Sequence, residues 1–181
     1  LPIGGDVGVD ATFSGPLREP EIDLDARDAT LSVGSVAIDD VHANVRFKGP
    51  IVEVRDAGAS VFDGRATAHG RLDLSGGVYE ADLVLERIDT TTLVPALAGR
   101  LSGSVRLRGP LSGRSAKADI DATLALDRRG PLPRRVRATG SLSLEERTLR
   151  TEDFLVSMSG ASAHLRGSAD LDGKRLDLRG T

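Results

Sequence analysis

Residues 99–113 read Gly-Arg-Leu-Ser-Gly-Ser-Val-Arg-Leu-Arg-Gly-Pro-Leu-Ser-Gly, and parts of this stretch occur earlier in the chain. Gly109-Pro110-Leu111 within it repeats Gly15-Pro16-Leu17, and the later Gly167 repeats Gly70 in a similar setting. The copies are about 95 residues apart, with a small drift that short hairpin insertions would explain. A repeat of alternating strands and glycine turns predicts an elongated β array, a form that usually binds or bridges.

The length of 181 residues is compatible with this arrangement. We expect residues 1–181 to be one continuous β segment of a longer protein, made of two loose repeats. The first repeat covers about residues 5–98 and the second about residues 99–181.

Composition excludes several classes of protein. The net charge is -3, from 24 basic and 27 acidic residues that are interspersed, which leaves no electrostatic footprint for nucleic acid. No apolar run approaches the roughly 18 residues of a membrane-spanning helix. The chain has no cysteine, so disulfides and thiolate metal sites are excluded. We therefore predict no nucleic-acid partner and no cofactor.

Apolar and polar residues alternate almost throughout the chain, most clearly over residues 7–13, 41–47, 79–85 and 120–126. A period of two with one polar side is typical of antiparallel strands that are solvated on one face. About fourteen such segments, mostly about 5–10 residues long, can be counted. The sequence thus predicts an all-β fold, an elongated and curved antiparallel meander.

Turn residues separate these segments, as in Gly49-Pro50 and Asp63-Gly64. Glycine and Asx residues tolerate the positive φ of tight hairpins, which favours pairing between neighbours in sequence. One interruption differs. Asp89 is a good N-cap, and it predicts a short helical insert near residues 90–98, limited to a turn or two by Pro95.

The pattern leaves open what covers the apolar side of the sheet. Two sheets could cover each other, or one curved sheet could form an open hydrophobic groove. With four Phe, one Tyr and no Trp, the inward residues are aliphatic, which suits a smooth groove at least as well as a sandwich core. Alternation alone does not separate the two arrangements.

Candidate catalytic and metal-binding residues are few. His42, His69 and His164 lie on different predicted strands, and no nucleophile elbow, phosphate loop or zinc motif occurs. We therefore predict that the chain is not an enzyme and holds no metal. Two other charged patterns are interpreted as solvated surface: the acidic pairs Asp23/Asp25, Asp119/Asp121 and Asp170/Asp172, and the arginine cluster of residues 128–137.

Residues 88–112 read Ile-Asp-Thr-Thr-Thr-Leu-Val-Pro-Ala-Leu-Ala-Gly-Arg-Leu-Ser-Gly-Ser-Val-Arg-Leu-Arg-Gly-Pro-Leu-Ser, a segment that resembles the TamB and AsmA-like proteins of the bacterial envelope. The shared elements are a short helical insert, Gly-x-Leu-x-Gly, a Leu-x-Gly-Pro-Leu hairpin and a further alternating strand. Residues 13–26 are similar to the same hairpin, and residues 61–74 resemble the later part of such repeats. The proline that follows the first hairpin is missing after the second, at residues 114–117.

This resemblance implies a long periplasmic protein of the bacterial cell envelope, anchored in the inner membrane. It implies an open β-groove, or β-taco, that carries phospholipid towards the outer membrane. It further implies an outer-membrane β-barrel partner of TamA type, and membrane contact through parts outside residues 1–181. The family has no catalytic residues to carry over.

The predicted function is therefore a segment of a bridge-like protein whose groove carries phospholipid acyl chains between the inner and outer membranes. The alternatives are a scaffold for outer-membrane protein assembly that binds nascent β-strands, and a structural β-repeat stalk. The alternation, and no family motif, nominates the lipid-binding groove residues: Val9, Phe13, Leu24, Val45, Phe47, Leu72, Leu74, Leu83, Leu85, Val105, Leu107, Ile120, Leu124, Leu126, Leu142 and Leu144.

Overall fold

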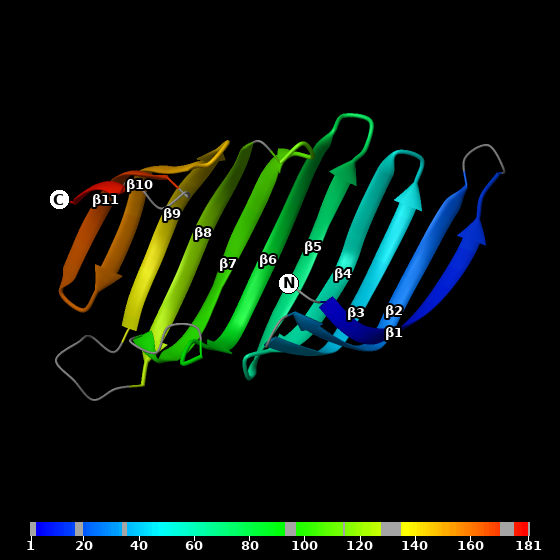
Figure 1. Ribbon diagram of the computed structural model, residues 1–181, viewed down its shortest axis with the longest axis horizontal. Helices are drawn as coiled ribbons and strands as arrows, with labels where there is room; N and C mark the ends of the chain where they lie inside the picture. The colour runs from blue at the N-terminus through cyan, green and yellow to red at the C-terminus, as the bar shows by residue number, and fades with distance from the viewer. Residues whose placement is uncertain are drawn as a thin grey trace.

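A computed structural model gives the fold of the chain as one all-β sheet. It describes residues 3–16, 20–33, 36–92, 97–113, 115–127, 135–170 and 176–180. Over these residues the sheet has 12 antiparallel strands, and their order in the sheet is their order in the sequence. Figure 1 shows them side by side from the blue β1 to the red end of the chain. The predicted elongated antiparallel meander is confirmed.

The strands are β1 (Ile3–Ser14), β2 (Glu21–Val33), β3 (Val36–Lys48), β4 (Ile51–Val61), β5 (Gly64–Asp73), β6 (Val78–Asp89), β7 (Gly99–Pro110), β8 (Ser115–Leu126), β9 (Arg135–Glu145), β10 (Thr148–Met158), β11 (Ala161–Asp170) and β12 (Leu176–Gly180). The described part of the chain thus has fewer strands than the roughly fourteen segments counted from alternation. Most of the strands are long, and irregularities within them break the alternation without ending the strand.

The connection between β6 and β7 was predicted to hold a short helix near residues 90–98. Residues 93–96 lie outside the described residues, and the described parts on either side contain a turn and no α-helix. The Asp89 carboxylate accepts a hydrogen bond from the Thr91 amide at 2.8 Å, and the buried Thr90 hydroxyl donates to the Leu97 carbonyl at 2.6 Å. These bonds hold the two ends of the connection together, so the Asp89 side chain supports a turn there.

Cross-strand register divides the sheet into two faces. On one face Leu83 of β6 lies opposite Ala68 of β5 and Val105 of β7. The next residue, Asp82, points the other way and lies opposite His69 and Arg106. Because paired residues share a side of the sheet, the same division continues through all the strands. We call the side of Leu83 the apolar face and the side of Asp82 the charged face.

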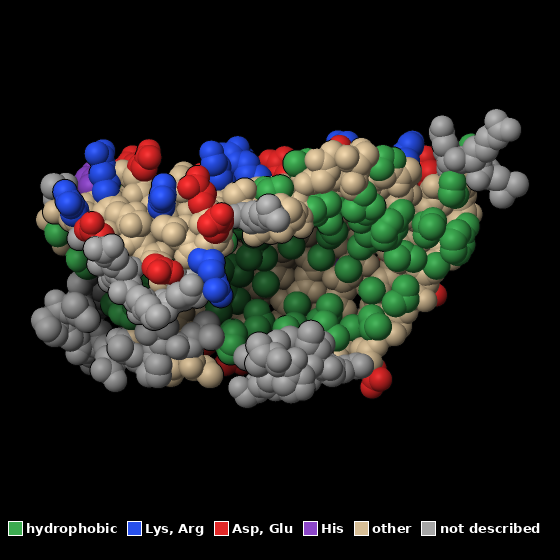
Figure 2. Space-filling model, turned by 45° about the horizontal axis from the view of Figure 1, so that its top comes forward, with side chains coloured by type: hydrophobic (Ala, Val, Ile, Leu, Met, Phe, Trp, Pro, Cys, Tyr) green, Lys and Arg blue, Asp and Glu red, His purple; other side chains and the backbone are tan. Residues whose placement is uncertain are grey.

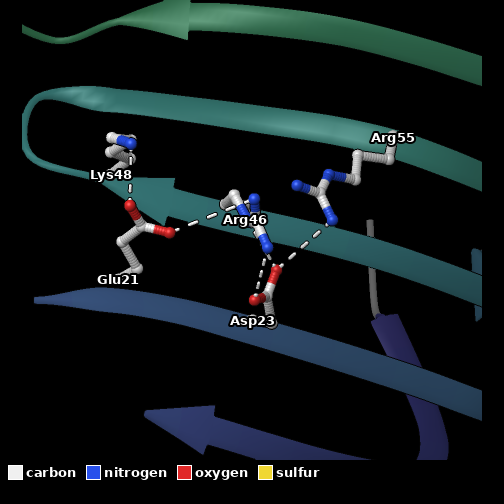
Figure 3. Close-up of polar contacts among 5 residues, drawn as sticks. All are labelled: Glu21, Asp23, Arg46, Lys48 and Arg55. Carbon is white, nitrogen blue, oxygen red and sulfur yellow. Dashed lines mark hydrogen bonds and ion pairs between the residues drawn. The ribbon is translucent and has the colours of Figure 1, made fainter. Parts of the chain in front are cut away.

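The charged face carries ion pairs that agree with this register. Acidic residues of β2 meet basic residues of β3: Arg46 makes two hydrogen bonds to Asp23, at 2.8 and 2.9 Å, and Lys48 lies 2.7 Å from Glu21. Arg55 of β4 approaches Asp23 at 3.6 Å, so one carboxylate lies between two guanidinium groups (Figure 3). Exposed pairs of this kind add little stability each, but opposite charges on facing strands favour this register over a shifted one.

The same alternation of charge recurs further along the sheet. Asp82 of the acidic strand β6 lies 2.7 Å from Arg106 of the basic strand β7. Asp121 of β8 accepts two hydrogen bonds from Arg137 of β9, at 3.0 and 2.7 Å. A strand whose side chains carry one sign of charge is stabilised by a neighbouring strand that carries the opposite sign. This favours pairing between strands that are adjacent in the sequence.

Glycines on the apolar face allow neighbouring strands to approach closely there. A Cβ added to Gly103 would overlap the carbonyl oxygen of Asp121 and lie 2.6 Å from the Cα of Ala122 on β8. A Cβ added to Gly70 or Gly140 would likewise meet the backbone of the next strand, at 2.7 and 2.5 Å. Removing the side chain on the inner face lets a sheet curl toward that face. Figure 2 shows the result, a hollow lined by hydrophobic side chains.

Irregular register keeps the apolar side chains on one face along each long strand. In β4 the register shifts between Val54 and Ala57, and in β6 and β7 it shifts between Leu85 and Ile88. Each shift is a bulge that inserts an extra residue, and Arg87 takes a positive φ of 54 degrees at the second one. Without these bulges, the later half of each strand would turn its apolar residues to the charged face.

The molecule has an unusually large surface. Its accessible area is 12440 Å² for a mass of 19.0 kDa, whereas a compact monomer of this mass exposes about 8,400 Å². Among the described residues only three hydrophobic side chains count as buried: Ala29, Val52 and Ile88. The apolar face is therefore the inner wall of an open trough.

The glycines matched between the two predicted repeats lie in or next to strands six positions apart. Gly70 lies in β5 and Gly167 in β11, while Gly15 follows β1 and Gly109 lies near the end of β7. Both matches relate strands six positions apart, and the predicted boundary coincides with the connection between β6 and β7. A unit of six strands is the repeat that this spacing predicts.

Candidate functional site

The candidate site is the groove formed by the apolar face. Its middle can be followed in one cross-strand row, which runs from β4 to β9 through Ala57, Ala68, Leu83, Val105, Ile120 and Gly140. Every member of this row is aliphatic or glycine. The row is therefore continuous across six strands and presents no polar side chain to an occupant.

All but one of the predicted groove residues occupy the apolar face. The register places them there on β1 to β3 and β5 to β9: Val9, Phe13, Leu24, Val45, Phe47, Leu72, Leu83, Leu85, Val105, Leu107, Ile120, Leu124, Leu126, Leu142 and Leu144. Most of these side chains are half-buried, whereas Val9 and Phe13 on the edge strand β1 are 54% and 72% exposed. The sheet thus gathers side chains that are far apart in the sequence into one surface.

Leu74 lies outside the strands, in the turn between β5 and β6, and is 56% exposed. Its amide donates to the Pro50 carbonyl at 2.8 Å. The strand ends one residue earlier because the Asp73 carboxylate accepts hydrogen bonds from the amides of Ser75 and Gly76. The bond from the Gly76 amide, together with one that the Ser75 hydroxyl donates at 2.7 Å, lowers the pKa of Asp73. Leu74 therefore lies outside the strands that form the groove, and its nomination as a groove residue was wrong.

Several residues that share the apolar face are not among the groove residues predicted from the sequence. They come from β2, β4, β6, β7 and β9 to β11: Ile22, Val52, Tyr79, Ile88, Leu101, Val136, Leu149, Phe154, Val156 and Leu165. The alternating pattern predicts Tyr79 and Val136, since each lies an even number of residues from the predicted groove residues of its strand. Ile88 and Phe154 lie beyond bulges, where parity counted from the start of the strand fails.

Nothing in the described part of the chain forms a second layer over this face. All described strands belong to the one sheet, and substantial packing joins only strands that are neighbours in it. Figure 2 shows hydrophobic side chains on the walls and floor of the hollow, with charged side chains outside it. Of the two arrangements that the sequence left open, the structure has the curved single sheet with an open groove.

The length of the groove suits extended hydrocarbon. Neighbouring strands are about 4.8 Å apart, so the 12 strands extend over roughly 50 Å along the groove. The hydrocarbon core of a bilayer is about 30 Å thick, so one acyl chain spans about 15 Å. The groove can therefore hold whole acyl chains laid along it. Small residues such as Gly70 and Ala81 on its floor leave room for their width.

The three histidines lie on the charged face and have carboxylate neighbours. His42 lies 3.5 Å from Asp56, His69 lies 3.5 Å from Asp82, and His164 lies 3.2 Å from Asp153. They come from β3, β5 and β11, so the sheet keeps them apart. Within the described ranges no group of three His, Cys, Asp or Glu side chains is placed to hold a metal ion.

The acidic pairs that the sequence singled out are engaged by arginines. Asp25 pairs with Arg27, and Asp119 accepts a hydrogen bond from Arg108 at 3.3 Å. Asp23 and Asp121 are bound by Arg46 and Arg137, as described above. For the last pair, Asp172 lies outside the described residues. Of the arginine cluster, residues 128–134 likewise lie outside them.

Ion pairing on the charged face lowers the pKa of several carboxyl groups. The hydrogen bonds from Arg46 lower the pKa of Asp23, and those from Arg137 lower the pKa of Asp121. The hydrogen bond from Lys48, with the charge of that lysine, lowers the pKa of Glu21. The charged face is therefore held by ionised carboxylates at neutral pH.

Acidification is expected to reduce the stability of the sheet. Carboxyl groups whose pKa is lower in the folded chain contribute stability that is complete above their unfolded pKa, near pH 4, and is lost as the pH falls through the folded pKa. The midpoint of urea unfolding should therefore drop between about pH 5 and pH 3. Asp23→Asn should show a smaller drop than the wild type. Equal drops in the two proteins would show that the Asp23–Arg46 pair does not contribute.

Comparisons of the chain with protein-family models, with curated proteins and with solved structures gave no match. No helix in the described residues has the length and apolar character needed to cross a membrane.

Proposed function

We propose that the chain binds acyl chains of phospholipid in its apolar groove and serves as a conduit along which they move. The observation that carries this proposal is the uncovered aliphatic face, which continues across neighbouring strands. Contiguous exposed apolar surface of this size calls for an apolar occupant.

The chemistry of the groove suits a long hydrocarbon chain. Each methylene moved from water to an apolar surface gains about 0.8 kcal/mol, so an acyl chain gains strongly from lying in the groove. The central row, from Ala57 to Gly140, offers no hydrogen-bonding side chain that would hold an occupant at one position. A bound chain can therefore slide along the groove at little cost.

The setting that we propose follows from the resemblance to TamB and AsmA-like proteins. In that setting the chain is part of a bridge in the bacterial periplasm that is anchored in the inner membrane. Phospholipid would pass along the groove to the outer membrane, where a β-barrel of TamA type would receive the far end of the bridge. Catalytic groups and cofactors have no part in this mechanism.

One observation favours a second candidate function, a scaffold for nascent outer-membrane strands. In the described part of the sheet, β1 pairs only with β2, and Val7, Val9 and Phe13 on it are strongly exposed. An unpaired strand edge with apolar side chains can accept another strand by β-augmentation. Crosslinks from β1 to barrel proteins, with no lipid in the groove, would favour the scaffold over the conduit.

Photo-crosslinking in cells tests the conduit directly. A photo-reactive residue is placed at Leu124, on the apolar face opposite Leu101 and Val136, or at Thr123, which lies opposite Ser102 and Arg137 on the charged face. Lipid labelling should be at least about fivefold higher at Leu124, because only that position contacts an acyl chain in the groove. Equal labelling at the two positions would contradict the proposal.

A further inference from the structure

The charged face has a cavity of about 700 Å³ near the ends of β5 to β9. Most of its lining belongs to two cross-strand rows of that face. The row nearer the middle of the sheet consists of Arg71, Glu80, Arg108, Lys117 and Ser143, and the row nearer the turns consists of Asp73, Val78, Pro110, Ser115 and Glu145. The remaining lining residues, Tyr79, Gly109, Ala116 and Leu144, alternate with these along the strands and belong to the apolar face. Most of the cavity lining is therefore on the side of the sheet opposite the groove.

The charge pattern changes within this cavity. In the inner row Arg71 lies opposite Glu80, and Glu80 lies opposite Arg108, so charges alternate as they do elsewhere on this face. The next residue, Lys117, lies directly opposite Arg108. Two like charges at paired positions of neighbouring strands destabilise a sheet. Lys117 is also a cation on β8, whose other charged residues on this face are Asp119 and Asp121.

The acids beside these two cations engage Arg108. It lies opposite Glu80 and reaches Asp119 at 3.3 Å. In the described part of the chain Lys117 has no ion pair. Glu145, at the border of the cavity, lies 3.5 Å from Arg150. The amine of Lys117 is thus left to solvent or to a ligand.

Hydroxyl groups lie beside the two cations. Ser143 of β9 is the cross-strand partner of Lys117, and Ser115 lies two residues before Lys117 on the same strand and face. Both serines line the cavity. A guanidinium, an ammonium and two hydroxyls offer several hydrogen-bond donors to one anion, in a space large enough to admit it.

We propose that this cavity binds a phosphate group between Arg108 and Lys117, with Ser143 and Ser115 as further donors. Arginine can bind two phosphate oxygens at once and lysine supplies a point charge, a combination that suits a phosphate monoester or diester. The carboxylates of Asp73, Glu80 and Glu145 also line the cavity and disfavour polyanions. The phosphate can come from a lipid headgroup at a membrane surface or from a small soluble phosphate.

The test uses the intact chain, Lys117→Gln, and Lys48→Gln as the matched control. Lys48 occupies a similar position near the end of β3 but pairs with Glu21 and lies outside the cavity. Binding is measured with inorganic phosphate by NMR, and with sedimented vesicles of phosphatidylglycerol and of phosphatidylcholine. Far-UV circular dichroism checks that each variant folds. Lys117→Gln should fold well, since it removes a repulsion.

Lys117→Gln should weaken binding by roughly five- to tenfold, while Lys48→Gln should match the wild type. A loss seen with inorganic phosphate identifies a soluble phosphate as a ligand. A loss confined to vesicles identifies the lipid headgroup. Arg108→Gln should give the same loss. Unchanged binding of both probes by Lys117→Gln, or an equal loss in Lys48→Gln, would overturn the proposal. Acyl binding in the groove is measured in a separate experiment, so the phosphate site and the acyl-binding groove can each be refuted without the other.

Discussion

Replacing Gly103 with alanine is expected to lower the free energy of unfolding by about 2–3 kcal/mol, although the change adds one methyl group. The added Cβ would overlap the Asp121 carbonyl oxygen and lie 2.6 Å from the Cα of Ala122. These are backbone atoms of β8, so they can give way only if the two strands move apart. That movement would flatten the trough where β7 meets β8.

The matched control is Gly8→Ala, also within a strand. A Cβ there would lie 3.7 Å from the Arg27 carbonyl oxygen, an ordinary contact. Removing a glycine from a strand restricts the unfolded chain, so this variant should be as stable as the wild type or slightly more stable. Urea unfolding of both variants measures the difference. If Gly103→Ala unfolds at the same urea concentration as Gly8→Ala, glycine does not permit the close approach that curves the sheet.

Much of the fold could be predicted from local patterns. Over residues 41–47 and 79–85, the apolar residues of the alternating pattern are the ones that the register places on the apolar face. Turn chemistry was also predicted correctly at Gly49-Pro50, which forms the β3–β4 hairpin turn with a positive φ of 55 degrees at Gly49. Both features depend on neighbours in the sequence, so the sequence alone is enough to recognise them.

Other features depend on interactions that a single strand does not reveal. The bulge between Val54 and Ala57 places two charged residues where strict alternation predicts one. Leu74 continues the parity of β5, but hydrogen bonds to the Asp73 carboxylate end the strand before it. The extent of a strand and the position of a bulge are set jointly by two partner strands, and their pairing becomes visible only in the sheet.

The open face could not be predicted because alternation is the same in a sandwich and in a groove. What separates them is curvature toward the apolar side together with the absence of a covering layer in the described residues. Glycines such as Gly70 and Gly103 permit this curvature, but in the sequence they show only a low propensity for strands. The pairing of the two cations Arg108 and Lys117 could not be predicted either, since the two residues meet only through the register.

The most direct measurement of acyl binding compares Leu83→Glu with Val84→Glu. Leu83 lies at the centre of the groove between Ala68 and Val105, whereas Val84, the next residue, lies on the charged face opposite Thr67 and Ser104 and is 37% exposed. The two variants carry the same new charge on the same strand, so they differ only in the face that receives it.

Binding of a fluorescent fatty acid to the intact chain is measured for both variants. A carboxylate on the apolar face must be desolvated when hydrocarbon covers it, and it also repels the acid group of the probe. Leu83→Glu should therefore bind at least about tenfold more weakly than the wild type, and Val84→Glu within about twofold of it. Equal affinities in the two variants would mean that the apolar face is not where the chain holds acyl groups.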